Sequence, residues 1–199
     1  MKRSNFLIGI TGNIGSGKST VLGFLKSKNY VVLSADDETA NAYIQAKPKL
    51  IERFSSEILG GNGEIDRKKL GEIVFSNEEK RKELNEILHP IIIETLFSKA
   101  KQLGGLVFVE VPLLFELSLQ NRFDEVWLVD TTNEIKIERV QKRDGITKEN
   151  ALKRLKSQDN SSELKRQFSH IIIENSGDIQ NLKTAVDVEL AKLEERLEK

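Results

Sequence analysis

The feature that most constrains this chain is a glycine-rich loop, Gly12-Asn13-Ile14-Gly15-Ser16-Gly17-Lys18-Ser19. It matches G-x-x-x-x-G-K-[ST], the loop that binds nucleotide phosphates between a buried strand and a helix. The context agrees, because residues 6–10 form an apolar run and residues 20–26 carry apolar side chains on one helical face. A chance match is expected in fewer than about one in a hundred chains of this length.

The loop predicts a nucleoside triphosphate as the ligand. Its glycines let backbone N–H groups turn inward, and the following helix presents the positive end of its dipole. Lys18 is expected to reach the β- and γ-phosphates, and Ser19 to ligate Mg²⁺. The other expected nucleotide-binding residues of this segment are Gly12, Asn13, Ile14, Gly15, Ser16, Gly17 and Thr20.

Composition excludes several classes of protein. The 31 basic and 31 acidic residues cancel, which argues against a general nucleic-acid binder but allows a local basic patch. The absence of cysteine excludes disulfide and thiolate chemistry. No apolar run approaches the ~18 residues of a membrane span, and the apolar stretch after Met1 is too short for a secretory signal. We expect a cytoplasmic monomer or weak homo-oligomer with a small-molecule substrate and no nucleic-acid or membrane partner.

Apolar runs predict an α/β fold of the P-loop type, a five-stranded parallel sheet flanked by helices. The expected strands cover residues 6–10, 30–33, 106–111, 125–130 and 170–174. A long helix is expected from Asp178 onward, with an apolar stripe that indicates core packing.

The spacing of these strands predicts an inserted domain. About 70 residues separate the second strand from the third, whereas a crossover needs only about a dozen. We interpret residues 38–103 as a helical domain that holds a second substrate, with helices at 40–54 and 77–103. Pro90 is expected to kink or restart the second helix. The nucleotide-binding core then comprises residues 1–37, 104–134 and 161–199.

Two acids lie at or just after the ends of predicted strands, at the edge where open parallel sheets bind ligands. Asp36 comes directly after the second strand and could be a catalytic or metal-binding carboxylate, or an ordinary helix N-cap. Glu110 lies at the end of the third strand, where a Walker-B-type acid would touch the Mg²⁺ shell, here through a water molecule.

Residues 135–160 are predicted to form a lid of two short helices. A capping box, Thr131-x-x-Glu134, is expected to open the first helix, and Gly145 to end it. Arg139 and Arg143 lie along this helix, and their planar guanidinium groups suit phosphate oxygens. A charge run of this kind is also typical of a solvated helix face.

Further motifs follow the phosphate loop in a fixed order. They are Ala35-Asp36, Gly63-Glu64-Ile65-Asp66-Arg67-Lys68-Lys69-Leu70 with Val74-Phe75, Leu84-Asn85-Glu86-Ile87-Leu88-His89-Pro90, Val111-Pro112-Leu113-Leu114-Phe115-Glu116, Arg143-Asp144-Gly145, Gln158 and Glu174-Asn175-Ser176-Gly177. Over nearly the whole chain this set closely resembles the dephospho-coenzyme A kinase family. The His-Pro and Val-Pro-Leu-Leu-Phe-Glu blocks are far more specific than the loop alone.

The resemblance implies ATP- and Mg²⁺-dependent phosphorylation of the ribose 3′-hydroxyl of dephospho-coenzyme A, the last step of coenzyme A biosynthesis. It implies Asp36 as the catalytic base, with Lys18, Arg139 and Arg143 offsetting charge on the transferring phosphoryl group. Acceptor-side residues are implied at Arg67, His89, Pro90, Pro112 and Leu113, and an adenine-side residue at Asn175.

The chain departs from the family pattern at three places. Ser34 stands where the family often has Asp, and Thr39, Ala40 and Asn41 stand where it has a basic residue. Asn13 replaces a common glycine of the phosphate loop. Its side chain must point away from the loop, or its backbone must adopt a left-handed conformation, which Asn tolerates better than most residues.

Other readings stay open at this point. Another small-molecule kinase would share the loop, the insertion and the lid, and would differ in its acceptor. A GTPase switch would need an Asn-Lys-x-Asp motif, which neither Asp130-Thr131-Thr132-Asn133 nor Asn175-Ser176-Gly177-Asp178 provides. A nucleotide or coenzyme A sensor would require that Asp36 or Lys18 be dispensable.

Overall fold

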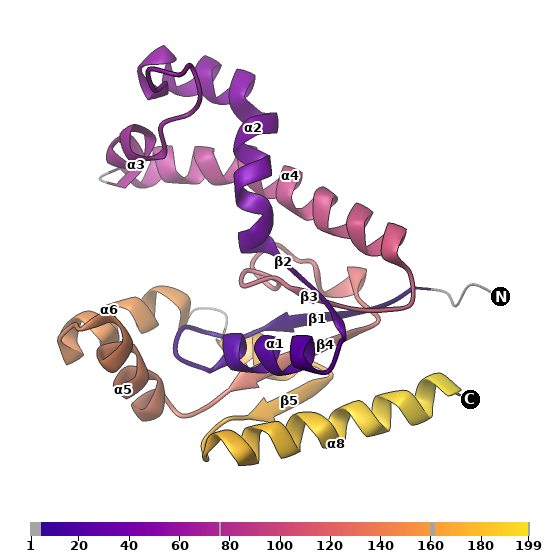
Figure 1. The fold of residues 1–199 in the computed structure, drawn as a ribbon. Coiled ribbons are helices and arrows are strands. Elements are labelled where there is room, and N and C mark those ends of the chain that lie inside the picture. The colour runs from indigo at the N-terminus through magenta and orange to yellow at the C-terminus, as the bar shows by residue number, and fades with distance from the viewer. Residues whose placement is uncertain (1–4, 76, 160–161, 199) are drawn as a thin grey trace. The chain divides into compact units, whose positions relative to one another are not determined.

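The computed structural model describes residues 5–75, 77–159 and 162–198, and of residues 157–159 the backbone alone. Within these ranges lies a five-stranded sheet with the order β2-β3-β1-β4-β5 (Figure 1). The strands are β1 (Phe6–Thr11), β2 (Val31–Ser34), β3 (Leu106–Glu110), β4 (Glu125–Asp130) and β5 (Ile171–Glu174). The predicted parallel sheet is confirmed, and β1 pairs in parallel with both β3 and β4.

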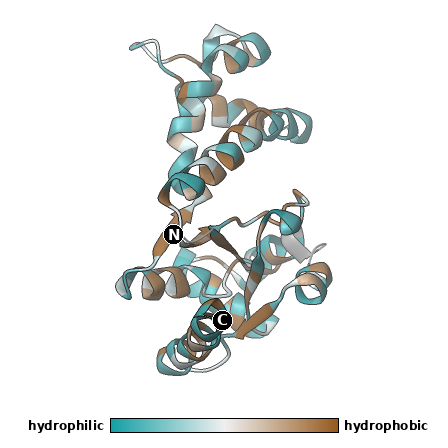
Figure 2. Ribbon diagram, turned by 90° about the vertical axis from the view of Figure 1, so that its right-hand side faces the viewer, coloured by the Kyte–Doolittle hydropathy of each residue, from teal (hydrophilic) through white to brown (hydrophobic). Residues whose placement is uncertain are grey.

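The core of the sheet lies where apolar strands meet two helices, α1 (Lys18–Ser27) and α8 (Ile179–Glu198). Ile8 and Ile10 of the central strand are fully buried, and the rings of Phe108 and Trp127 meet edge to face at 5.5 Å. The apolar stripe of α8 packs into the same cluster, as predicted, through Leu182, Val186, Leu190 and Leu193. In Figure 2 the strands are mostly brown, the colour of hydrophobic residues, whereas the helices carry both brown and teal, the colour of hydrophilic residues.

Residues 34–103 form a separate compact unit, and residues 1–33 and 104–199 form the other. The separate unit contains α2 (Ala35–Phe54), the short 3-10 helix η1 (Ser56–Ile58), α3 (Arg67–Phe75) and α4 (Glu78–Leu103). Buried side chains recur every fourth residue, at 42, 46, 50 and 54 on α2 and at 84, 88, 92, 96 and 100 on α4. This spacing places one apolar row on each helix, and α2 packs against α4.

Pro90 lies inside α4, and the helix continues through it. The prediction that the helix restarts at this residue is therefore wrong. A proline removes one N–H donor, and the apolar row on both sides of it, from Leu84 to Ala100, keeps the helix packed. The same holds for Pro48 inside α2.

The segment between β4 and β5 holds α5 (Asn133–Asp144), α6 (Lys148–Asp159) and α7 (Ser162–Phe168). The N-cap of α5 is Thr132, whose hydroxyl accepts from the Ile135 N–H, so the capping box predicted at Thr131 is off by one residue. Gly145 ends α5 in a left-handed conformation, as expected. The short η2 (Gln120–Arg122) precedes β4. Among the described residues, no helix is long and apolar enough to cross a bilayer.

Candidate active site

The phosphate loop joins β1 to α1, and two of its glycines have left-handed backbones. Gly15 has φ +78°, and a Cβ there would lie 2.7 Å from the carbonyl oxygen of Lys136 on α5. Gly17 has φ +94°, caps α1 and would collide with the Asn175 amide if it carried a Cβ. The loop therefore rests directly on α5 and on the residue after β5, and only glycine fits at both contacts.

Lys18 forms an ion pair with Glu110, and their side chains are 16% and 8% exposed. Lys18 is the first residue of α1, and Glu110 is the last residue of β3. Because β3 lies beside β1, the acid is held next to the phosphate loop. The two residues singled out for phosphate and metal chemistry are thus brought together.

The side chain of Asn13 points away from the loop. Its Nδ2 donates to Ser162 Oγ at 2.7 Å, and its Oδ1 accepts from Lys165 Nζ at 2.8 Å. Its backbone is not left-handed, so of the two conformations considered for this residue the first is observed. Lys165 is buried on α7 and also pairs with Glu116 at 3.0 Å.

Arg139 and Asn175 contact each other and the phosphate loop. Asn175 Nδ2 donates to the Ser16 carbonyl at 2.7 Å, and Arg139 Nη2 donates to the Asn175 carbonyl at 3.0 Å. Both predicted residues therefore contact the loop in this structure. A guanidinium carries five N–H donors, so these contacts leave donors of Arg139 unused.

Asp130, the last residue of β4, accepts from Lys136 Nζ at 2.7 Å and also pairs with Arg166. Burial raises the pKa of Asp130, but the hydrogen bond and charge of Lys136, with help from Arg166, lower it below its ordinary value overall. Lys136 is itself buried. The ion pair therefore fixes the start of α5, on which Gly15 rests, to the edge of the sheet.

Arg143 has different surroundings from Arg139. Its side chain is 61% exposed, and its Nε donates to Asp144 Oδ1 at 2.7 Å. Asp144 also pairs with Arg154 of α6, and these arginines lower the pKa of Asp144. The end of α5 is thereby joined to α6 by one carboxylate.

In the helical unit, Asp36 is exposed in the first turn of α2, and its N–H donates to Ser34 Oγ at 3.3 Å. Ser34, which stands where the family often has Asp, is the N-cap of α2 and so has a structural role. Two residues further on, the buried Glu38 accepts from Lys99 Nζ at 2.6 Å. This pair ties the first turn of α2 to α4.

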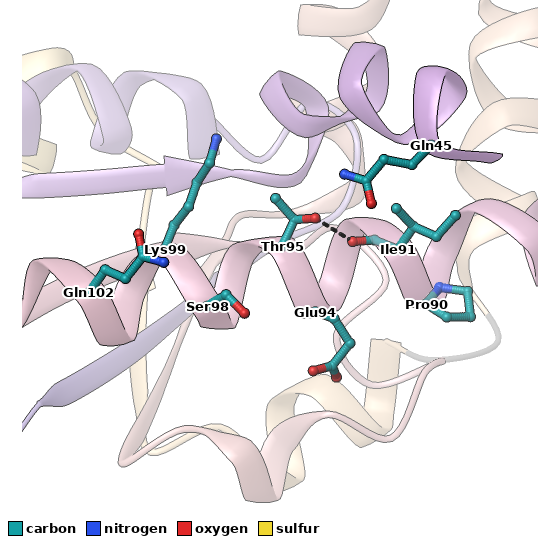
Figure 3. A pocket seen from close by; sticks show the side chains of 8 residues that line it. All are labelled: Gln45, Pro90, Ile91, Glu94, Thr95, Ser98, Lys99 and Gln102. Carbon is teal, nitrogen blue, oxygen red and sulfur yellow. Dashed lines mark hydrogen bonds between the residues drawn. The ribbon is translucent and has the colours of Figure 1, made fainter. Parts of the chain in front are cut away.

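The acceptor-side residues of this unit lie on α3 and α4. The Arg67 guanidinium lies 4.9 Å from the centroid of the Tyr43 ring, a cation–π distance. Burial lowers the pKa of His89, which favours a neutral imidazole at pH 7. Pro90 lines a groove of about 630 Å³ between α4 and Gln45 of α2 (Figure 3), whose other lining residues are Ile91, Glu94, Thr95, Ser98, Lys99 and Gln102.

The described residues contain no cluster of three or more His, Cys, Asp or Glu side chains that could hold a metal. Mg²⁺ does not need such a cluster, because it is usually bound by one or two protein oxygens together with phosphate oxygens and water. The Ser19 hydroxyl and the Glu110 carboxylate fit that donor set.

Comparison with known proteins identifies the family. The model of the dephospho-CoA kinase family matches residues 6–181, which include the phosphate loop, the helical unit and Asn175. The chain belongs to the dephospho-CoA kinase family. It is therefore a P-loop kinase.

Individual relatives agree with the dephospho-CoA kinase family assignment. A dephospho-CoA kinase of Staphylococcus haemolyticus is 40% identical over 183 residues, covering 89% of this chain and 90% of the relative. A solved structure from Thermus thermophilus has a TM-score of 0.80 at 37% identity, covering 96% of this chain and 99% of that one. The solved dephospho-CoA kinase of Campylobacter jejuni has a TM-score of 0.67 at 27% identity, covering 95% and 97%.

Sequence reasoning missed part of this kinase's site. Lys136, Lys165 and Asp130 support the phosphate loop, yet no motif marked them. Lys165 belongs to α7, a short and mostly polar helix, and Lys136 lies in a run that also fits a solvated face. The side chain of Gln158 and residues 160 and 161, which the predicted motifs and boundaries include, lie outside the described part.

Proposed function

We propose that this kinase transfers the γ-phosphoryl group of ATP to the ribose 3′-hydroxyl of dephospho-CoA and so makes CoA, the last step of its biosynthesis. The observation that carries the proposal is the family match over residues 6–181, because it spans the phosphate loop and the helical unit together. Within it, a lysine and an acid that suit phosphate and metal chemistry are paired at the loop.

On the nucleotide side, the loop N–H groups and Lys18 would bind the β- and γ-phosphates. Ser19, with Glu110 acting through water, would hold Mg²⁺, which when bound neutralises phosphate charge and fixes the geometry of the triphosphate. Arg139 and Arg143 would neutralise further charge on the transferring group. Asn175, whose side chain lies next to Gly17, would belong to the nucleotide side.

On the acceptor side, Asp36 would accept the 3′-hydroxyl proton and orient the oxygen for in-line attack. Its side chain is exposed in the first turn of α2. The helical unit would bind the rest of the acceptor through Arg67, His89 and Pro90. Pro112 and Leu113, in the loop after β3, would contact the acceptor from the core.

The groove beside Pro90 supports acceptor binding by the helical unit. It is lined by amide, hydroxyl and charged side chains together with Pro90 and Ile91, and Thr95 Oγ1 donates to the Ile91 carbonyl at 2.7 Å within it (Figure 3). A mixed lining of this kind suits a long, partly polar ligand such as a pantetheine arm. We assign residues 38–103 to the acceptor and residues 135–160 to a lid, and place the enzyme in the cytoplasm as a monomer or weak homo-oligomer.

The test is an ADP-release assay with Mg²⁺-ATP and the purified full chain. Dephospho-CoA is compared with adenosine, AMP, CMP and shikimate as acceptors. Turnover with dephospho-CoA alone is expected, and Lys18→Ala should abolish it. Turnover with a different acceptor would replace the proposed substrate and leave the phosphate chemistry in place. Turnover with none of them would contradict the proposal.

A further inference from the structure

The peptide between Ser16 and Gly17 is held from one side by a buried asparagine. Asn175 is 5% exposed, and its Nδ2 donates to the Ser16 carbonyl at 2.7 Å. Arg139 Nη1 lies 3.5 Å from the same oxygen, as a second and longer donor. Ser16 is fully buried, so water does not compete for this carbonyl.

The orientation of the Asn175 amide is itself fixed by its neighbours. Its backbone N–H donates to the Asp130 carbonyl at 2.8 Å, which anchors the residue to the end of β4. Arg139 Nη2 lies 3.0 Å from the Asn175 carbonyl and 3.4 Å from Oδ1. A guanidinium has only donors, and the amide NH₂ cannot accept a hydrogen bond, so Oδ1 faces Arg139 and Nδ2 faces Ser16.

In a trans peptide the carbonyl and the following N–H point in opposite directions. A Ser16 carbonyl drawn toward Asn175 therefore turns the Gly17 N–H to the opposite side of the peptide. Successive N–H groups turned to one side of a loop form the concave site in which phosphate oxygens bind. Gly17 also allows this contact, because any Cβ there would collide with Asn175 Nδ2.

We propose that Asn175 is a positioning residue that sets the orientation of the Ser16–Gly17 peptide and thereby the phosphate affinity of the loop, with Arg139 holding its amide in place. The proposal rests on the loop binding a triphosphate, as proposed above, and does not depend on the acceptor. A residue just past β5 can support nucleotide binding in two ways. One is contact with the base, and the other is control of the loop.

Inorganic tripolyphosphate distinguishes the two, because it has the phosphates of ATP and no adenine. Calorimetry would measure the affinity of the wild type and of Asn175→Ala for ATP and for tripolyphosphate at the same Mg²⁺ concentration. Loss of one buried hydrogen bond to the loop is expected to weaken both ligands about tenfold. Weakened ATP binding with tripolyphosphate binding within twofold of the wild type would overturn the proposal and indicate base contact.

Two further variants test the interpretation of this experiment. Asn175→Asp keeps the shape and the acceptor for Arg139 but removes the donor to Ser16, and it should weaken both ligands as well. Asn181→Ala changes an exposed asparagine on α8 and should alter neither affinity. Thermal unfolding and the KM for dephospho-CoA are measured for each variant. If a folded Asn175 variant changed only the KM for the acceptor, a positioning role at the loop would be wrong.

Discussion

Lys18 at the start of α1 and Glu110 at the end of β3 form an ion pair in which both side chains are mostly buried. An acid so close to the lysine that we propose binds phosphate has two consequences. It compensates the lysine charge, because a buried unpaired charge is costly. Under the proposed function, it would also supply an anionic oxygen to the water shell of Mg²⁺. These consequences lead to different results when the acid is removed.

The Glu110→Gln variant should distinguish support of the Mg²⁺ shell from compensation of the Lys18 charge. If the carboxylate supports the Mg²⁺ shell, the Mg²⁺ concentration for half-maximal rate should rise about tenfold, with the rate restored at high Mg²⁺. If Glu110 only compensates Lys18, Mg²⁺ dependence should stay the same and Mg²⁺-free ATP should bind more tightly. We expect the first result, measured as rate against free Mg²⁺. Glu57→Gln removes an equally negative but exposed side chain of the other unit and serves as the control.

Asp36→Asn should lower kcat by about 10²- to 10⁴-fold, the usual contribution of a general base. ATP affinity should stay close to the wild-type value, because the proposed role of Asp36 is toward the acceptor. Asp37→Asn is the matched control, since Asp37 is the next residue of α2 and is also exposed. Steady-state kinetics with dephospho-CoA gives kcat, and near-normal turnover by Asp36→Asn would rule the residue out as the base.

Gly15→Ala and Gly23→Ala should act in opposite directions. At Gly15 the backbone is left-handed, and the new methyl would press on the Lys136 carbonyl, so ATP affinity and thermal stability should both fall. At Gly23, inside α1, no heavy atom lies within 4 Å of the new Cβ. Helix propensity should then raise the free energy of unfolding by up to about 1 kcal/mol. Denaturant unfolding and ATP titration of both variants check this, and equal effects would contradict it.

The Asp130–Lys136 pair should make stability depend on pH in acid. The pKa of Asp130 in the folded protein lies below its ordinary value of 3.8. The ionised group therefore stabilises the fold above pH 3.8, and this contribution disappears as the pH falls through the folded-state pKa. Asp130→Asn should reduce the free energy of unfolding by about 3 kcal/mol at pH 7, because Lys136 stays buried without its partner. The difference in the free energy of unfolding between the wild type and Asp130→Asn should become smaller in acid. A difference that stayed constant across pH would show that the charge of Asp130 is not responsible.

The lid assignment predicts protection from trypsin on ligand binding. Residues 135–160 contain exposed basic cleavage sites such as Arg143 and Lys153. Closure over both substrates should slow cleavage there when ATP and dephospho-CoA are added together, and much less with either alone. Mass spectrometry of the fragments identifies the sites. Unchanged cleavage in this segment would count against a lid.

Local patterns were sufficient for the strands and for the loop. The four apolar residues at 126–129 stand between two acids, and this segment predicted the bounds of β4, Glu125 to Asp130, without error. The phosphate loop could be placed because its glycines and lysine stand at fixed spacing between a strand and a helix. Such signals are contained in adjacent residues, and tertiary contacts did not override them.

The supporting contacts could not be predicted, because they join distant parts of the chain. Asn13 meets Lys165 across 152 positions, and Asn175 meets Ser16 across 159. From the sequence alone, a lysine that becomes buried, such as Lys165, cannot be distinguished from one that stays exposed to solvent. Pro90 shows the reverse case, since a local rule predicted a kink or a restart, and packing along α4 kept the helix from restarting.

The sheet order also determines when the phosphate loop can take its shape during synthesis. β1 is made first, yet its two neighbours begin at Leu106 and Glu125. The helical unit is one continuous stretch, residues 34–103, and its helices pack on one another locally, so it can fold while the ribosome is still making the rest. Asn175 follows later still. The phosphate loop therefore leaves the ribosome well before the strands and the asparagine that complete it.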